Sequence, residues 1–184
     1  MTPLTTSPIF HNMRAINPNT ITIGGGLHIQ PPKPLPKNLK QYLDEAKEGV
    51  IYFSLGSNVK GNFLNDESKK AIMNAFSQLP NKVLIKIDLE NINVSRNVRV
   101  EKWLPQQDIL RHPNMKLFVT QGGLQSVQEA VTNGVPMVGI PFFGDQYNNI
   151  FKSVKKGFAV MVDKGNITTE SFKEALLEVL KNPK

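Results

Sequence analysis

The chain has 184 residues, enough for one domain with a substantial hydrophobic core. Its hydrophobic content of 40% and charged content of 20% are globular values and exclude a disordered chain. The net charge is +7, and the absence of cysteine excludes disulfides and thiolate metal sites. The lysines are scattered, with no basic helix face carrying interleaved aromatics. This pattern favours a solvated basic surface over nucleic-acid binding, and it leaves attraction of an anionic ligand or an acidic membrane surface open.

The first 36 residues form a proline-rich lead-in. They contain seven prolines, and proline removes a backbone donor and breaks helix interiors. We therefore predict an extended linker over residues 1–36, with a short strand at 21–23, and one domain over residues 37–184. A helix is expected at residues 39–46, where this domain begins.

The next segments alternate between strand and helix. Residues 50–55 are almost continuously apolar, as in a strand buried on both faces, and a Gly-Ser-Asn turn ends them. A helix is expected at residues 66–79, where apolar residues recur at helical spacing. Strands are expected at residues 82–87 and 98–102, and the second of these leads to the single tryptophan.

Residues 103–149 are the stretch around which the chain is organised. An apolar run at 116–120 leads into a Gly-Gly turn and a helix that stops at Asn-Gly. A second apolar run at 135–141 leads into a Gly-Asp-Gln turn. Such an order places polar groups at the carboxyl ends of parallel strands, where open α/β sheets bind ligands.

The last segments continue the alternation. A helix is expected at residues 147–154, a strand at 157–162, and a final helix capped by Thr168. Strands alternating with helices along the whole domain predict an α/β fold with a doubly wound, Rossmann-like parallel sheet.

The stretch 103–149 resembles the signature of the UDP-glycosyltransferases, the UDP-glucuronosyl and UDP-glucosyl transferases of glycosyltransferase family 1. The segments GGLHI at 25–29 and VIYFSLGSNV at 50–59 are similar to the animal branch, especially to insect enzymes. The resemblance implies the carboxyl-terminal, donor-binding half of a two-domain GT-B glycosyltransferase, with residues 1–36 connecting the two domains. The signature residues are, in order, Trp103, Pro105, Gln106, Leu110, His112, Pro113, Thr120, Gly122, Gly123, Ser126, Glu129, Gly134, Val135, Pro136, Met137, Asp145, Gln146 and Asn149.

The nucleoside of a UDP-sugar is assigned by this resemblance to three side chains whose chemistry suits it. Trp103 can stack on the uracil ring, and Gln106 can pair with the uracil edge or the ribose. Glu129 can accept hydrogen bonds from the two ribose hydroxyls. A plainer role stays open for two of them, because Trp103 suits a protein core and Glu129 suits a solvated helix face.

The diphosphate is expected at two turns. Gly122 and Gly123 let the backbone approach a phosphate and begin a helix whose N-terminus favours anions. Ser126 adds a hydroxyl in the first turn of that helix, and Gln125 can contribute its backbone amide. Ser57, in the turn after the first strand of the domain, is a further phosphate or sugar contact, with a plain polar turn as the alternative.

The hexose is expected beside Asp145 and Gln146, which can bond sugar hydroxyls; a turn-forming Asp is the alternative. Lys86 suits a place near the donor phosphates and a solvated strand edge equally well. Gln107 is expected on a helix surface, and His112 is expected to be structural at a helix stop.

Position 121 departs from the commonest family pattern. Many members have histidine between the threonine and the glycine pair, whereas this chain has Gln121. Glutamine can donate a hydrogen bond but cannot carry a positive charge. Gln121 is therefore expected to contact the donor without supplying charge to its phosphates.

The resemblance implies inverting transfer of a hexose, most simply glucose, from a UDP-hexose to a hydroxyl of a small lipophilic molecule. The family's His–Asp base lies in the amino-terminal domain, so no catalytic residue is expected in this chain, which should be inactive alone. No metal or cofactor is expected beyond the UDP-sugar co-substrate, because no His, Asp and Glu stand at metal-ligand spacing. Two alternatives stay open: a nucleotide-sugar binding module without turnover, and another UDP-sugar enzyme such as an epimerase.

Location is expected from the same resemblance. No signal peptide or membrane-spanning run is found in the sequence, so the chain by itself is expected to be soluble. Full-length animal members resemble lumenal proteins of the endoplasmic reticulum membrane that act in detoxification, with a signal peptide and an anchor outside this region. Sequons at Asn93 and Asn166 permit glycosylation in that compartment.

Overall fold

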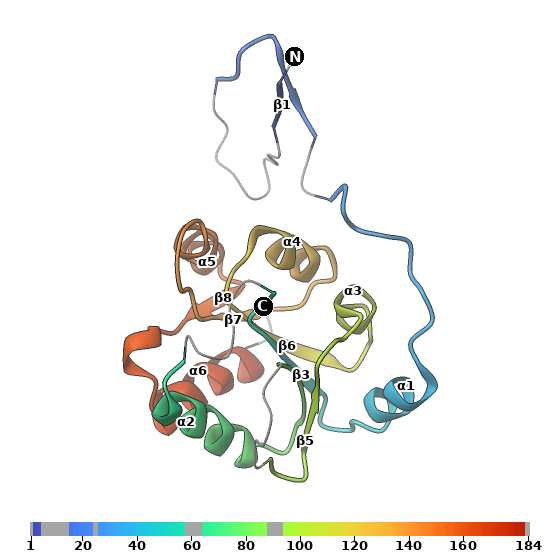
Figure 1. The fold of residues 1–184 in the computed structure, drawn as a ribbon, viewed down its shortest axis with the longest axis vertical. Coiled ribbons are helices and arrows are strands. Elements are labelled where there is room, and N and C mark those ends of the chain that lie inside the picture. The colour runs from blue at the N-terminus through green and yellow to red at the C-terminus, as the bar shows by residue number, and fades with distance from the viewer. Residues whose placement is uncertain (1, 5–14, 24–25, 58–63, 88–93, 183–184) are drawn as a thin grey trace.

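The computed structural model of the chain describes residues 2–4, 15–23, 26–57, 64–87 and 94–182 (Figure 1). Asn58 and the sequon residue Asn93 lie outside the described residues. The lead-in carries a small sheet, in which β1 (Thr2–Leu4) pairs in parallel with β2 (Thr20–Thr22). From residue 26 to Pro36 the chain runs along the outside of the domain without helix or strand until α1 (Lys37–Asp44) begins (Figure 1).

Six parallel strands form the sheet of the domain, in the order β5-β4-β3-β6-β7-β8. Counted from β3, this is the order 3-2-1-4-5-6 of the doubly wound fold, so the predicted Rossmann-like parallel sheet is confirmed. The strand order reverses between β3 and β6, which makes the ends of these two strands the expected ligand crevice. The strands are β3 (Val50–Ser54), β4 (Lys82–Lys86), β5 (Val98–Glu101), β6 (Met115–Thr120), β7 (Met137–Gly139) and β8 (Ala159–Met161).

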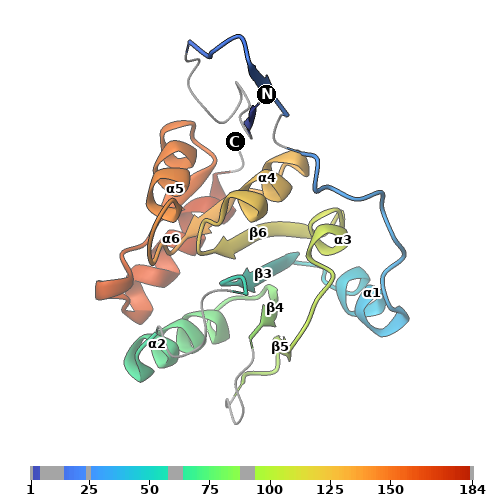
Figure 2. The same ribbon diagram turned by 45° about the horizontal axis from the view of Figure 1, so that its top comes forward.

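Helices cover both faces of this sheet (Figure 2). On one face lie α2 (Asp66–Ser77) and α6 (Thr169–Lys181), which a short 3-10 turn, η2 (Lys164–Asn166), precedes. On the other face lie α1, α3 (Gln106–Leu110), α4 (Leu124–Thr132) and α5 (Gln146–Lys155).

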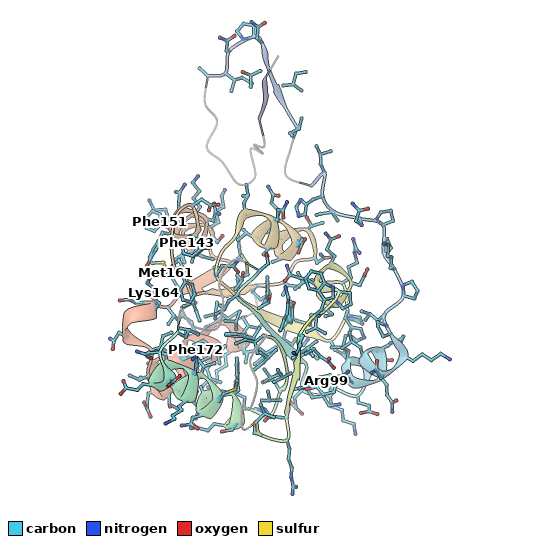
Figure 3. The ribbon with its side chains drawn as sticks, viewed as in Figure 1. Arg99, Phe143, Phe151, Met161, Lys164 and Phe172 are labelled. Carbon is cyan, nitrogen blue, oxygen red and sulfur yellow. The ribbon has the colours of Figure 1, made fainter. Side chains whose placement is uncertain are left out.

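Each face of the sheet has its own apolar core. Phe76 of α2 and Phe172 of α6 meet edge to face with ring centroids 5.4 Å apart (Figure 3). On the opposite face Tyr52 of β3 stacks on Phe118 of β6 with centroids 5.1 Å apart. The apolar residues of β3 enter the two cores alternately, and all five residues of the strand are buried, as the apolar run predicts.

Helices α2 and α6 begin where side chains accept hydrogen bonds from their first backbone amides. Asn65 Oδ1 accepts from the Ser68 amide at 2.7 Å at the start of α2. Thr168 and Ser171 exchange two bonds of 3.0 Å as a capping box on α6, so the predicted Thr168 cap is confirmed. The predicted helices and strands differ from the observed ones by one or two residues at their ends, where the last turns are the least strongly specified.

Candidate functional site

Gln121 directly follows β6, at the point where the strand order reverses, and its side chain is only 6% exposed. Its amide lies against two glycines: a Cβ on Gly56 would stand 2.2 Å from Gln121 Nε2, and one on Gly123 would stand 3.1 Å from it. Thr120 Oγ1 donates to Gln121 Oε1 at 3.1 Å and orients the amide. The turns after β3 and β6 therefore meet through this amide, and Ser57 stands exposed beside it.

Gly122 has a packing role that the sequence did not reveal. Its φ of +88° is left-handed, and a Cβ there would stand 2.5 Å from Ile150 Cγ1 of α5. Asn149 Nδ2 donates to the Gly122 carbonyl at 3.0 Å and to Asp145 Oδ2 at 2.8 Å. Gly122 thus holds the start of α5 beside the turn that begins α4, and its approach to a phosphate stays a prediction.

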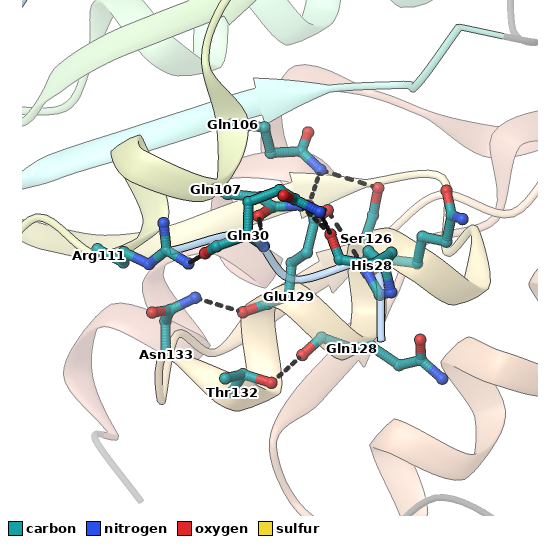
Figure 4. Close-up of polar contacts among 11 residues, drawn as sticks. His28, Gln30, Gln106, Gln107, Arg111, Ser126, Gln128, Glu129, Thr132 and Asn133 are labelled. Carbon is teal, nitrogen blue, oxygen red and sulfur yellow. Dashed lines mark hydrogen bonds and ion pairs between the residues drawn. The ribbon is translucent and has the colours of Figure 1, made fainter. Parts of the chain in front are cut away.

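Three predicted nucleoside and phosphate contacts are joined to one another between α3 and α4 (Figure 4). Gln106 Nε2 donates to Ser126 Oγ at 3.0 Å and to Glu129 Oε2 at 2.6 Å. The hydroxyl of Tyr52 donates to Gln106 Oε1 at 3.3 Å, and burial raises the pKa of the Tyr52 phenol, so it stays protonated at neutral pH. The structure therefore brings Gln106, Ser126 and Glu129 into one polar cluster.

Gln107 belongs to the same cluster, so the expectation that it lies on a helix surface is wrong. Its Nε2 donates to Glu129 Oε1 at 2.9 Å and to the His28 carbonyl at 3.1 Å. The ring of His28, from the lead-in, has Nε2 at 3.4 Å from Glu129 Oε1 and 3.3 Å from the Gln125 carbonyl. Because α3 has only five residues, it is too short to show a periodic pattern. The sequence therefore carried no signal that Gln107 contacts Glu129.

Trp103 is 75% exposed, which excludes a core role for this side chain. The Lys86 ammonium lies 4.5 Å from the ring centroid, within cation–π distance. Partial burial lowers the pKa of the Lys86 amine, so this lysine is not a fully solvated strand edge. A flat aromatic surface just after β5 and a cation at the end of β4 therefore stand side by side.

The predicted hexose contacts lie where β7 leads into α5. Gln146 is 4% exposed, and its Oε1 accepts from the backbone amides of Phe142 and Phe143 at 2.8 and 3.2 Å. Asp145 is exposed, and Asn149 occupies one of its oxygens. Gln146 thus shapes the loop, and Asp145 is the more accessible of the two for a sugar hydroxyl.

The model of the family described as UDP-glucoronosyl and UDP-glucosyl transferase matches residues 6–184. The chain belongs to this family. UDP-glucosyltransferase 2 of Dactylopius coccus is 42% identical over 163 residues, covering 89% of this chain and 32% of that protein. UDP-glucuronosyltransferase 2B17 of Mus musculus is 45% identical over 161 residues, covering 86% of this chain and 30% of that protein. The chain thus spans about a third of the length of the curated relatives it matches.

Solved structures of glycosyltransferases share the fold of the chain. The glycotransferase of kitacinnamycin matches with a TM-score of 0.70 at 27% identity, covering 89% of this chain and 42% of that one. UDP-glucose: anthocyanidin 3-O-glucosyltransferase in complex with UDP shares the fold, with a TM-score of 0.70 at 24% identity over 83% of this chain and 36% of that one. The GT-B fold class is confirmed. Insect and mammalian relatives are similarly identical, so an insect type stays a prediction.

The remaining histidine that the structure describes, His112, has structural contacts. Its Nε2 lies 3.1 Å from Asp44 Oδ1, and its Nδ1 accepts from the Asn114 amide at 3.2 Å, which ties α1 to the end of α3.

Among the described residues, no group of three or more His, Asp or Glu side chains is placed to hold a metal ion. In the same part of the chain, no helix combines the length and apolarity needed to cross a bilayer.

Proposed function

We propose that this chain binds the UDP-hexose donor of a glycosyltransferase that moves a hexose, most simply glucose, to a hydroxyl of a small lipophilic molecule with inversion. The proposal needs no metal and no cofactor beyond the UDP-sugar. The acceptor and its activating base would come from the rest of the full-length protein. Membership of the family supports the reaction class, and the polar cluster around Glu129 supports the donor.

The cluster of Gln106, Ser126 and Glu129 beside exposed Trp103 is the observation on which the proposal rests. A nucleoside needs a flat surface for its base and acceptors for its ribose diol, and these residues offer both next to the switch point of the sheet. The Gly122 turn leads into the N-terminus of α4, and Asn149 joins this turn to Asp145. We therefore assign the base to Trp103, the ribose to the cluster, the diphosphate to the N-terminus of α4 and the hexose to Asp145.

The chain is expected to bind UDP with a dissociation constant of roughly 10 μM to 1 mM, because half a cleft buries only part of the ligand. It should not release UDP from UDP-glucose in the presence of phenol or steroid acceptors. Calorimetric titration and a UDP-release assay measure both results. Absence of UDP binding would refute donor recognition. Acceptor-dependent release would place a base within the chain, with His28 beside Glu129 as the candidate.

Replacing Trp103 with alanine is expected to weaken UDP binding by about 1–3 kcal/mol, through loss of stacking and of the flat contact area. UDP should also quench the fluorescence of this single tryptophan. Phe151→Ala is a matched control, because Phe151 is 49% exposed and has Lys155 Nζ 4.6 Å from its ring centroid, on the outer side of α5 (Figure 3). Equal losses of UDP affinity in the two variants would argue against uracil stacking.

We further propose that the full-length protein is a lumenal, membrane-anchored protein of the endoplasmic reticulum. The sequon residue Asn166 supports this, because it is exposed in η2 and accessible for glycosylation. A mobility shift on glycosidase treatment of the full-length protein, abolished by Asn166→Gln, would support use of this site. A full-length protein recovered without any membrane fraction would contradict the location.

A further inference from the structure

We propose that Gln107 and His28 are positioning residues that hold the Glu129 carboxylate in the orientation needed for the ribose diol. The lead-in segment is then a working part of the donor site as well as a connector. This inference rests on the proposed function, since it assumes that Glu129 meets the ribose of a UDP-sugar.

Glu129 is 7% exposed, and a buried carboxylate requires hydrogen-bond donors around it. Its two oxygens are approached from different elements. Oε2 accepts from Gln106 of α3 at 2.6 Å, whereas Oε1 accepts from Gln107 at 2.9 Å and lies 3.4 Å from His28 Nε2 (Figure 4). A carboxylate offers about four acceptor positions, so this arrangement fixes its plane and leaves capacity for a ligand hydroxyl.

The Gln107 amide is itself fixed at both ends. Its Oε1 accepts from the Gln30 amide at 2.8 Å, and its Nε2 also donates to the His28 carbonyl at 3.1 Å. Since the oxygen is occupied by the lead-in backbone, the amide presents only its N–H groups to Glu129. The lead-in thereby fixes the orientation of the Gln107 amide, and this amide in turn orients the Glu129 carboxylate.

A second set of contacts holds the lead-in against α3. The Lys33 amide donates to Asp108 Oδ1 at 2.9 Å, and Arg111 bonds both Asp108 and the Gln30 carbonyl. On the lead-in these bonds involve Gln30 and Lys33, which follow His28. The lead-in is therefore attached independently of Glu129, so removing one contact to the carboxylate leaves the lead-in in place.

A fixed carboxylate binds two vicinal hydroxyls more tightly than a carboxylate that rotates, because it loses little conformational entropy on binding. The chain should therefore prefer UDP over 2′-deoxy-UDP by roughly tenfold, the size expected for a hydrogen bond to a charged group. Gln107→Leu should reduce that preference to less than about threefold and leave the affinity for 2′-deoxy-UDP within about twofold. A purely structural role would weaken both nucleotides alike.

Gln41→Leu is the matched control for Gln107→Leu. Gln41 Nε2 also donates to a glutamate, Glu45 Oε1, at 2.9 Å, but on α1 and outside the cluster. It should keep the full preference for UDP. His28→Ala should lower the preference for UDP over 2′-deoxy-UDP about two- to threefold. Because His28 lies outside both apolar cores, this variant tests the positioning role if Gln107→Leu fails to fold. In a Glu129→Gln background, neither change should lower the preference further.

Calorimetry of the chain with both nucleotides separates the outcomes. No binding of UDP by the parent would refute the proposed function. Binding without a preference for UDP would remove the ribose role of Glu129, and this inference with it. A parental preference that survives in both Gln107→Leu and His28→Ala would overturn this inference alone and leave donor binding intact.

Discussion

Gly122→Ala is expected to lower the free energy of unfolding of this domain by about 2–5 kcal/mol. The left-handed φ of +88° strains any residue with a Cβ, at about 1–2 kcal/mol. The added methyl would also stand 2.5 Å from Ile150 Cγ1 and 3.1 Å from the Gln146 carbonyl oxygen. Ile150 is fully buried, so it cannot move aside freely, and overpacking of this kind adds about 1–3 kcal/mol. Urea unfolding followed by circular dichroism measures the loss.

Gly144→Ala provides the control for strain without overpacking. Gly144 has a φ of +62°, but a Cβ there would meet nothing within 4 Å. This variant should lose only about 1–2 kcal/mol, with an unchanged denaturant slope. If Gly122→Ala and Gly144→Ala are equally stable, Gly122 does not hold α5 against the turn.

The fold could be predicted from the sequence because its signals are local. The apolar run 50–55 indicates a strand buried on both faces, and the helix at 66–79 has a regular apolar stripe. Alternation of such elements leaves few topologies, and the right-handed crossover rule selects the doubly wound one. The ends of elements were less certain, since they depend on caps and on one or two hydrogen bonds.

The sequence predicts which residue types form the candidate site, but it does not predict which of these residues contact one another. Glu129 stood out as a carboxylate on the polar side of a helix, but its contacts with Gln107 and His28 join segments far apart in the sequence. Tyr52 reads as one more apolar residue of a strand, although its hydroxyl reaches Gln106. Gly122 was recognisable as a turn residue, whereas the neighbour that excludes a side chain there comes from α5. Such contacts follow from packing, which sequence periodicity does not encode.

The proximity of Gly56 to Gln121 gives a specific role to the residue that departs from the family pattern. Gln121 fills the gap between the turns after β3 and β6, where open α/β sheets place a ligand. Its amide has a neutral donor end beside the Gly56 turn, in the region proposed for the diphosphate. A substitution that displaces this amide should therefore lower the affinity for UDP.

Gly56→Ala is accordingly expected to weaken UDP binding roughly tenfold, about 1.4 kcal/mol. The new Cβ would stand 2.2 Å from Gln121 Nε2, so the amide must move from its place. The φ of +75° adds strain, for which Gly134→Ala is the control. Gly134 has a φ of +64° and open space around it, and it lies between α4 and β7, at the amino ends of the strands. Calorimetry with UDP should show no change for Gly134→Ala. In a Gln121→Ala background Gly56→Ala should weaken UDP binding less than about twofold, since no amide remains to be displaced. A full tenfold loss in that background would mean that Gly56 acts on the nucleotide through its own backbone and not through Gln121.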